Sequence, residues 1–246
     1  MELEFLEIVQ GCFSLIFVVI SIIIGIKLIF KYFEKKNREL YLVGITWIGI
    51  STPWMGGSIS FIMFLLIDSL LSDEIRFIIG NVFIPAVVVI WLIVFTDLFY
   101  KKQQKYILII FSVLGICFEI VFFIFLFTDP SLIGTFVGPF RASYTPFIRI
   151  IMAFYASVAL ITGVIFALKT IKADISLEAN LRGKFILIAF PSFAVGSILD
   201  VLIPITPITI ITRLILISSA LEFYCGFSLP KFIKRHFLEK NNKKTQ

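Results

Sequence analysis

Long apolar stretches separated by short charged segments constrain this chain more than any other feature of its sequence. A helix needs roughly 20 apolar residues to cross the hydrocarbon core of a bilayer, and seven stretches of the 246-residue chain have about that length or more. Hydrophobic residues make up 59% of the chain and charged residues 15%, whereas a soluble domain carries about 45–50% and about 25%. The chain is therefore predicted to be a multi-pass protein of the cell membrane.

The apolar runs are continuous and do not alternate with a period of two, which favours an all-α transmembrane bundle over a membrane β-barrel. Residues 1–229 are predicted to form one seven-transmembrane helix bundle. Pro204 and Pro207 predict a tight turn before the last helix. The seven predicted spans cover residues 5–30, 40–70, 77–100, 106–127, 146–168, 185–203 and 208–229.

Lysine and arginine are distributed unevenly between the two sides of the predicted bundle. Eighteen of the 22 basic residues lie in alternate connecting segments or in the tail, and the other side holds only Arg76, Arg141, Arg149 and Arg213. Because cytoplasmic loops carry the excess of Lys and Arg, the N-terminus is predicted to be outside and the C-terminus cytoplasmic. The same bias accounts for the net charge of +6, so no nucleic-acid partner is expected.

Two segments outside the spans carry further predictions. Residues 230–246 form a predicted basic amphipathic cytoplasmic tail, which suits the anionic inner leaflet of the lipid bilayer and alternatively a soluble partner. The segment 128–145 on the other side is unusually apolar for a loop. It is predicted to fold back over the mouth of the bundle, either as a packing cap or as a lid over a ligand cavity.

Polar residues at membrane depth are energetically costly and are therefore candidates for function. Pro53 and the pair Gly56-Gly57 interrupt the second predicted span, and irregular backbone survives at this depth only where protein or a cavity satisfies it. A packing kink and a central polar cavity are the two interpretations. The candidate ligand-binding residues are Ser51, Thr52, Trp54, Ser58, Glu119, Arg149, Asp200 and Arg213.

Structural roles compete with ligand binding for the charged members of this set. At 1.5 Å per residue, Asp200 and Arg213 lie at comparable depth, so an ion pair between the last two spans is the first expectation and a ligand or ion site the second. Glu119 lies near the middle of its span, where Arg149 could reach toward it or where its carboxyl could be protonated.

Two further acids, Asp97 and Glu222, lie near the inner ends of the third and seventh predicted spans. Acids at this depth commonly pair with the basic connecting segments. The functional alternative is a conformational latch that breaks when the bundle rearranges, and both residues are therefore candidates for carrying an output signal.

Residue patterns typical of enzymes and of metal or cofactor sites are missing from the sequence. The single histidine, His236, lies in the tail, so histidine metal sites, bis-histidine haem ligation and Ser–His catalysis lack their residues. No phosphate-binding glycine loop is found. We therefore expect the chain not to be an enzyme and to require no metal or cofactor.

The topology resembles the seven-transmembrane sensor regions of prokaryotic histidine kinases and related receptor-like signalling proteins. The resemblance covers about residues 5–229. Its local part is the segment Leu181-Arg182-Gly183-Lys184-Phe185 followed by Pro191 and Gly196-Ser197, with Trp47 and Pro85 in earlier spans. No kinase domain follows in this sequence, so the resemblance implies that a signal would pass to a separate protein. High Ile, Phe and Lys content is typical of a prokaryotic, AT-rich genome.

These observations together predict a stand-alone seven-transmembrane sensor or receptor-like protein. A small unidentified ligand would bind from outside, and a separate signalling protein at the cytoplasmic face would receive the output. The alternatives are a small secondary transporter with a mid-membrane site and a structural membrane subunit.

Overall fold

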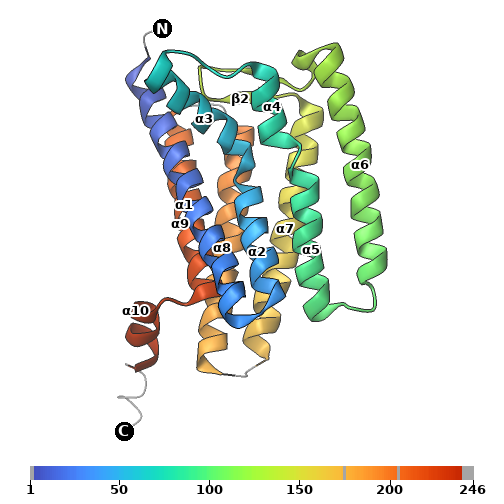
Figure 1. Ribbon diagram of the computed structural model, residues 1–246, viewed down its shortest axis with the longest axis vertical. Coiled ribbons are helices and arrows are strands. Elements are labelled where there is room, and N and C mark those ends of the chain that lie inside the picture. Colours follow the sequence, from blue (N-terminus) through green and yellow to red (C-terminus); the bar gives the residue numbers. More distant parts are fainter. Residues whose placement is uncertain (1–2, 174–175, 204–205, 240–246) are drawn as a thin grey trace.

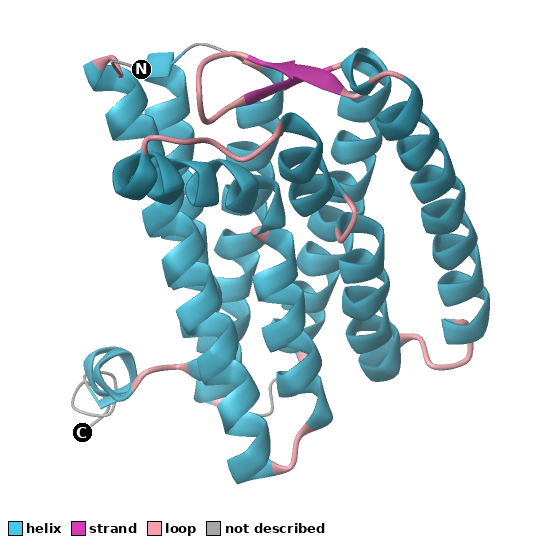
Figure 2. Ribbon diagram, turned by 45° about the horizontal axis from the view of Figure 1, so that its top comes forward, coloured by secondary structure: helices cyan, strands magenta, loops and turns pink. Residues whose placement is uncertain are grey.

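The computed structural model describes residues 3–173, 176–203 and 206–239, and almost all of them are helical (Figures 1 and 2). The elements are, in chain order, α1 (Phe5–Lys35), α2 (Arg38–Ile50), α3 (Thr52–Ile67), α4 (Asp73–Asn81), α5 (Ile84–Phe99), α6 (Gln104–Thr128), η1 (Pro130–Leu132), β1 (Gly134–Phe136), β2 (Ala142–Tyr144), α7 (Pro146–Lys172), α8 (Leu177–Leu202), α9 (Thr206–Ser228), α10 (Lys231–Lys234) and η2 (Arg235–Glu239).

Within the described residues, six helical units are long and apolar enough to cross a membrane: α1, α4 with α5, α6, α7, α8 and the Ile208–Ser228 part of α9. The predicted span 40–70 corresponds to α2 and α3, which are bent by 57° relative to each other and make a seventh span if the pair counts as one. The chain is thus an all-α, multi-pass membrane bundle. The predicted turn at Pro204 lies outside the described residues.

The break between α2 and α3 follows from its residues. Pro53 lies in the first turn of α3, where its missing N–H costs little, but it cannot continue the hydrogen bonding of α2. The hydroxyl of Ser51 donates to the Ile48 carbonyl at 2.7 Å, and that of Thr52 donates to the Gly49 carbonyl at 2.8 Å. Side chains therefore satisfy carbonyls that the bend releases inside the apolar bundle.

Two other predicted boundaries differ from the observed ones. The predicted span 77–100 is divided into α4 and α5, and α5 begins with Pro85 in its first turn, a position that favours a helix start. The predicted span 185–203 begins earlier, at Leu177, because the Ser176 hydroxyl accepts a hydrogen bond from the Ala179 N–H at 3.1 Å and caps the helix.

The helices pack side by side around an aromatic core, with α8 between α7 and α9, α1 beside α2 and α9, and α6 at one edge beside α5 (Figure 1). The core contains Phe17, Trp47, Trp91, Phe190 and Phe223. Large apolar side chains also cover the outer surface, most densely on α6, as a lipid-facing helix requires.

Segment 128–145 lies across the end of the bundle that carries the N-terminus, as predicted. It forms η1 and a two-stranded antiparallel hairpin, in which Gly134 pairs with Tyr144 and Phe136 with Ala142 (Figure 2). Arg76 of α4 donates to the Pro139 carbonyl at 2.8 Å and stacks on the Phe136 ring at 3.5 Å. These contacts hold the hairpin onto α4.

The described part of the tail, residues 230–239, lies at the opposite end of the bundle (Figure 1). Lys234 forms an ion pair of 2.6 Å with Glu178 at the start of α8. Phe232 and Phe237 are exposed, which leaves both rings available to a membrane surface. The remaining residues of the predicted tail, 240–246, lie outside the described residues.

Candidate functional site: a polar-ended cavity under the hairpin

A cavity of about 120 Å³ lies inside the bundle beneath the hairpin. A water molecule needs roughly 10–15 Å³ of such space, so the cavity has room for a small ligand. Its walls come from α1, α2, α3, α5, α7, α8 and α9, and hairpin residues Phe140 to Ala142 and Tyr144 close its upper side. The segment that was expected to be either a packing cap or a lid therefore does lie over a cavity.

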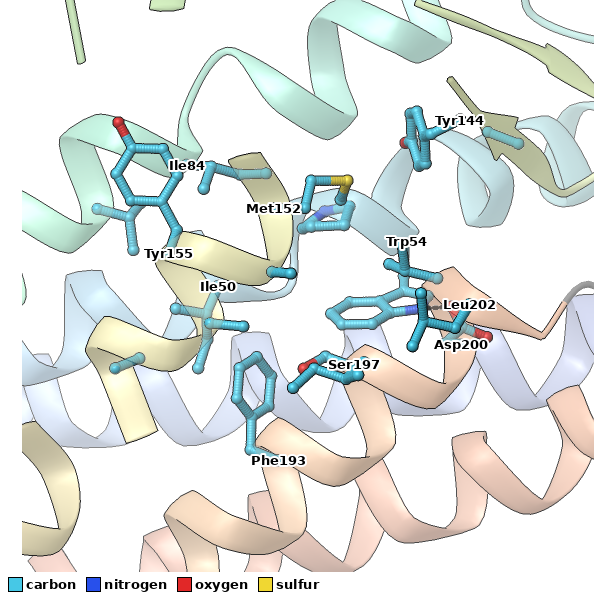
Figure 3. Close-up of a pocket in the computed structure, with 18 of the residues that line it drawn as sticks. Ile50, Trp54, Ile84, Tyr144, Met152, Tyr155, Phe193, Ser197, Asp200 and Leu202 are labelled. Atoms are coloured by element: carbon cyan, nitrogen blue, oxygen red, sulfur yellow. Dashed lines mark hydrogen bonds between the residues drawn. The ribbon is translucent and has the colours of Figure 1, made fainter. Parts of the chain in front are cut away.

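Asp200 is the centre of the polar end of this cavity (Figure 3). Its carboxylate accepts hydrogen bonds from the Trp54 indole N–H at 2.9 Å and from the Thr212 hydroxyl at 3.2 Å. Nη1 of Arg213 lies 2.7 Å from the same carboxylate, and Nε of Arg213 donates to the Ser14 hydroxyl at 2.9 Å. The predicted ion pair between Asp200 and Arg213 is confirmed, and it joins α8 to α9 and, through Ser14, to α1.

Arg141 brings a second buried cation to the same end. Its guanidinium donates to the backbone carbonyls of Asp200 at 2.5 Å and Ile203 at 2.8 Å, and to the Thr209 hydroxyl. These carbonyls belong to the last turn of α8, where the helix dipole favours a positive charge. Burial lowers the pKa of Arg141 from its usual value, and Arg213 lowers it further while Asp200 opposes the shift. Arg141 therefore ties the hairpin to the end of α8.

Tyr144 contributes a hydroxyl from the hairpin to the cavity wall. Burial raises the pKa of Tyr144 to about 12, so the phenol stays protonated at neutral pH. Its oxygen lies 3.5 Å from the Asn81 side-chain amide. The phenol is thus a neutral polar group on the side of the cavity nearest α4.

The rest of the wall is mostly apolar, with Ile50, Met152 and Phe193 facing the space away from Asp200 (Figure 3). Below it, Trp47 stacks on Phe223 with ring centroids 3.7 Å apart. These two rings and Phe193 line a second, smaller space of about 20 Å³. A layer of aromatic rings therefore separates the cavity from the lysine-rich end of the bundle.

The structure brings together three of the eight residues predicted to bind ligand. Trp54, Asp200 and Arg213 line the cavity. Ser51, Thr52 and Ser58 are buried outside its lining, and each hydroxyl donates to a carbonyl of the preceding helical turn. Their observed role is to support the broken span.

Glu119 and Arg149 also lie outside the cavity lining. Arg149 donates to the Ser143 hydroxyl at 3.2 Å. Both Glu119 carboxyl oxygens are buried without a hydrogen-bond partner among the described residues. The suggested contact between these two side chains is thus not formed, because Arg149 is bonded to the hairpin and Glu119 lies on α6.

Asp97 and Glu222 lie toward the opposite end of the bundle from the cavity. Asp97 pairs with Lys101 and, at 3.8 Å, with Arg38, which links the ends of α2 and α5. Pairing with a basic segment is confirmed for Asp97. Glu222 instead accepts a hydrogen bond from the Ser218 hydroxyl of its own helix at 2.8 Å, so the expected basic partner is not observed among the described contacts.

Arg141, Ser14 and Tyr144 line the cavity but were not among the predicted site residues. Arg141 carried one usable signal, because it is one of few basic residues on the lysine-poor side of the chain. Among the described residues, no group of three or more His, Cys, Asp or Glu side chains is placed to hold a metal ion.

Comparison of the chain with protein-family models, with curated proteins and with solved structures finds no match. The geometry of the cavity therefore has to support any functional proposal by itself.

Proposed function

We propose that this chain is a receptor-like membrane protein that binds a small molecule in the cavity beneath the hairpin. The observation that carries the proposal is the cavity itself, whose apolar walls end in the polar cluster of Trp54, Asp200 and Arg213. Ligand sites commonly combine an apolar lining with a few converging polar groups. The resemblance to sensor regions of histidine kinases agrees with this proposal.

The sidedness of the proposal rests on charge. The helix ends and loops at the α1–α2, α5–α6 and α7–α8 connections and the tail carry most of the lysines, and the hairpin lies at the other end of the bundle (Figure 1). Under the positive-inside rule the cavity faces the outside, and the output leaves through the cytoplasmic end. Asp97, which connects three charged or polar side chains there, is the residue through which a helix movement would reach a separate signalling protein.

Thiol labelling tests whether the cavity is reached from outside. Ser197 lines the cavity, so we replace it by cysteine in a chain whose native Cys12, Cys117 and Cys225 are changed to serine. Small membrane-impermeant methanethiosulfonates, one anionic and one cationic, are added to right-side-out or inside-out vesicles. Ser58→Cys is the matched control, because Ser58 is buried in a neighbouring helix but lies outside the lining.

Labelling of Ser197→Cys only from the side of the N-terminus, with Ser58→Cys unreactive, is the expected result. Labelling from both sides would favour the second candidate, a secondary transporter. That candidate is supported by the broken α2–α3 span, since discontinuous helices often build transport sites. No labelling from either side would contradict a ligand that enters from the aqueous phase.

A further inference from the structure

The charged groups at the polar end of the cavity do not balance. Arg141 and Arg213 line the cavity together with one carboxylate, Asp200. Both guanidinium groups are buried, with exposed fractions of 7% and 3%. Among the described residues, Asp200 and Arg213 are the charged groups that shift the pKa of Arg141. The charged residues that line this end of the cavity therefore sum to one excess positive charge, and such a charge on a buried residue is costly without a counterion.

The two guanidinium groups at this end differ in their partners. Nη1 of Arg213 lies 2.7 Å from the Asp200 carboxylate, and its Nε donates to the Ser14 hydroxyl. Among the described residues, the hydrogen bonds of Arg141 go to neutral oxygens. Guanidinium groups bind planar carboxylates with two parallel hydrogen bonds and are the preferred partners of such groups in buried sites.

The remainder of the cavity suits a hydrocarbon segment. Ile50, Met152, Ala156 and Phe193 line it, and the labelled side chains among them lie on the side away from Asp200 (Figure 3). The Tyr155 ring points away from the polar cluster (Figure 3). A ligand that fills this space must therefore be apolar over most of its length.

From the excess charge, the absence of a carboxylate among the described hydrogen-bond partners of Arg141 and the apolar wall, we propose that the ligand is a small amphiphile with one negatively charged head group, best matched by a carboxylate. The head lies between Arg141 and Arg213, and the tail extends toward Ile50 and Phe193. This inference rests on the proposed function, and it adds the chemical class of the ligand. Both a free acid and an anionic lipid carry such a head group, and the two share the same recognition chemistry.

Arg141 has a purely structural alternative role, because its hydrogen bonds to the carbonyls of α8 would hold the hairpin in place without any ligand. The test must therefore separate the charge of Arg141 from its folding role. Arg141→Gln removes the positive charge and keeps an amide donor. Arg141→Lys keeps the charge and loses the planar guanidinium that can donate two parallel hydrogen bonds. Arg149→Gln is the matched control, since Arg149 also contacts the hairpin but lies outside the lining.

The experiment uses the full chain in nanodiscs of phosphatidylcholine and follows its thermal unfolding during titration with octanoate. Octanol and octylammonium serve as neutral and cationic probes with the same tail. A further set of nanodiscs contains phosphatidylglycerol without octanoate, so that a lipid-borne head group is distinguished from a free acid. Because this measurement needs no labelling, it gives a result whether or not Ser197→Cys reacts.

We expect saturable stabilisation by octanoate, or by phosphatidylglycerol if the head group is lipid-borne, and none by octylammonium. Arg141→Gln should weaken the apparent affinity about tenfold, as expected for one charge-assisted hydrogen bond, while Arg141→Lys and Arg149→Gln retain most of it. Equal or stronger stabilisation by octylammonium, or an octanoate effect that Arg141→Gln leaves unchanged, would overturn the inference. The inference would also be overturned if neither octanoate nor phosphatidylglycerol stabilised the chain. If the cavity is labelled from outside but the chain shows no preference for anionic probes, the receptor proposal is retained. Only the proposed class of ligand is then wrong.

Discussion

The three tryptophans of the bundle allow the contribution of the Asp200 cluster to stability to be measured against internal references. All three are buried, but their indole N–H groups have different partners. Trp54 donates to the Asp200 carboxylate at 2.9 Å, and Trp91 donates to the Thr162 hydroxyl at 2.7 Å. The Trp47 N–H has no hydrogen-bond partner among the described residues. Substitution by Phe removes the N–H in each case and keeps an aromatic ring.

The magnitudes follow from the partners. A hydrogen bond to a charged group contributes about 1.5–3 kcal/mol, and a neutral one between membrane helices averages about 0.6 kcal/mol. The smaller ring leaves a comparable void at all three sites, so differences between the variants report on the N–H. We expect Trp54→Phe to lower the free energy of unfolding by about 1.5–3 kcal/mol more than Trp47→Phe does. For Trp91→Phe we expect an additional loss of about 0.6 kcal/mol over Trp47→Phe.

Reversible unfolding in mixed micelles of a nonionic detergent and dodecyl sulfate measures these free energies. The wild-type chain is the common reference, and far-ultraviolet circular dichroism checks that each variant keeps its helical content. If Trp47→Phe proved as costly as Trp54→Phe, the reasoning would be refuted, because the bond to Asp200 would then contribute no net free energy.

Two further predictions concern packing and the inner end of the bundle. Gly163→Ala should destabilise the chain by about 1–3 kcal/mol, because the new Cβ would lie 2.1 Å from the Phe190 ring; Gly80→Ala, whose Cβ would meet nothing closer than 3.6 Å, is the control. Equal stability of the two variants in the same unfolding assay would contradict the close approach of α7 and α8. Asp97→Asn should cost about 1 kcal/mol or less, since it removes a pair with the exposed Lys101. A loss several times larger would mean that this acid holds the helix ends together.

Depth arguments from the sequence located the charged pair correctly. Asp200 and Arg213 flank the predicted turn at similar distances, and helical rise alone places them at the same level of the membrane. The structure confirms the pair at 2.7 Å. Helical rise does not predict whether Glu119 and Arg149 are in contact, because the depth of a residue does not show which faces of two helices meet.

The pair Gly56-Gly57 shows how a local pattern can be interpreted incompletely. In the sequence it suggests a loosened helix beside a proline. In the structure a Cβ at Gly57 would lie 2.4 Å from the carbonyl oxygen of Phe140, so this glycine lets the hairpin backbone lie directly on α3. The contact joins segments far apart in the chain, and no periodicity in either segment reports it.

The apolar runs of the chain were enough to predict its membrane environment, its helical class and the positions of most spans. Each depends on the local density of apolar residues, because a bilayer forces any chain that crosses it to satisfy its backbone within the span. The position of Arg141 beside Arg213 and Asp200 in one cavity became visible only in the folded chain. That arrangement depends on how an irregular loop folds back onto the ends of helices distant in sequence. Hydrogen bonds to backbone carbonyls hold Arg141 there, and every residue has such carbonyls, so the sequence carries no record of the contact.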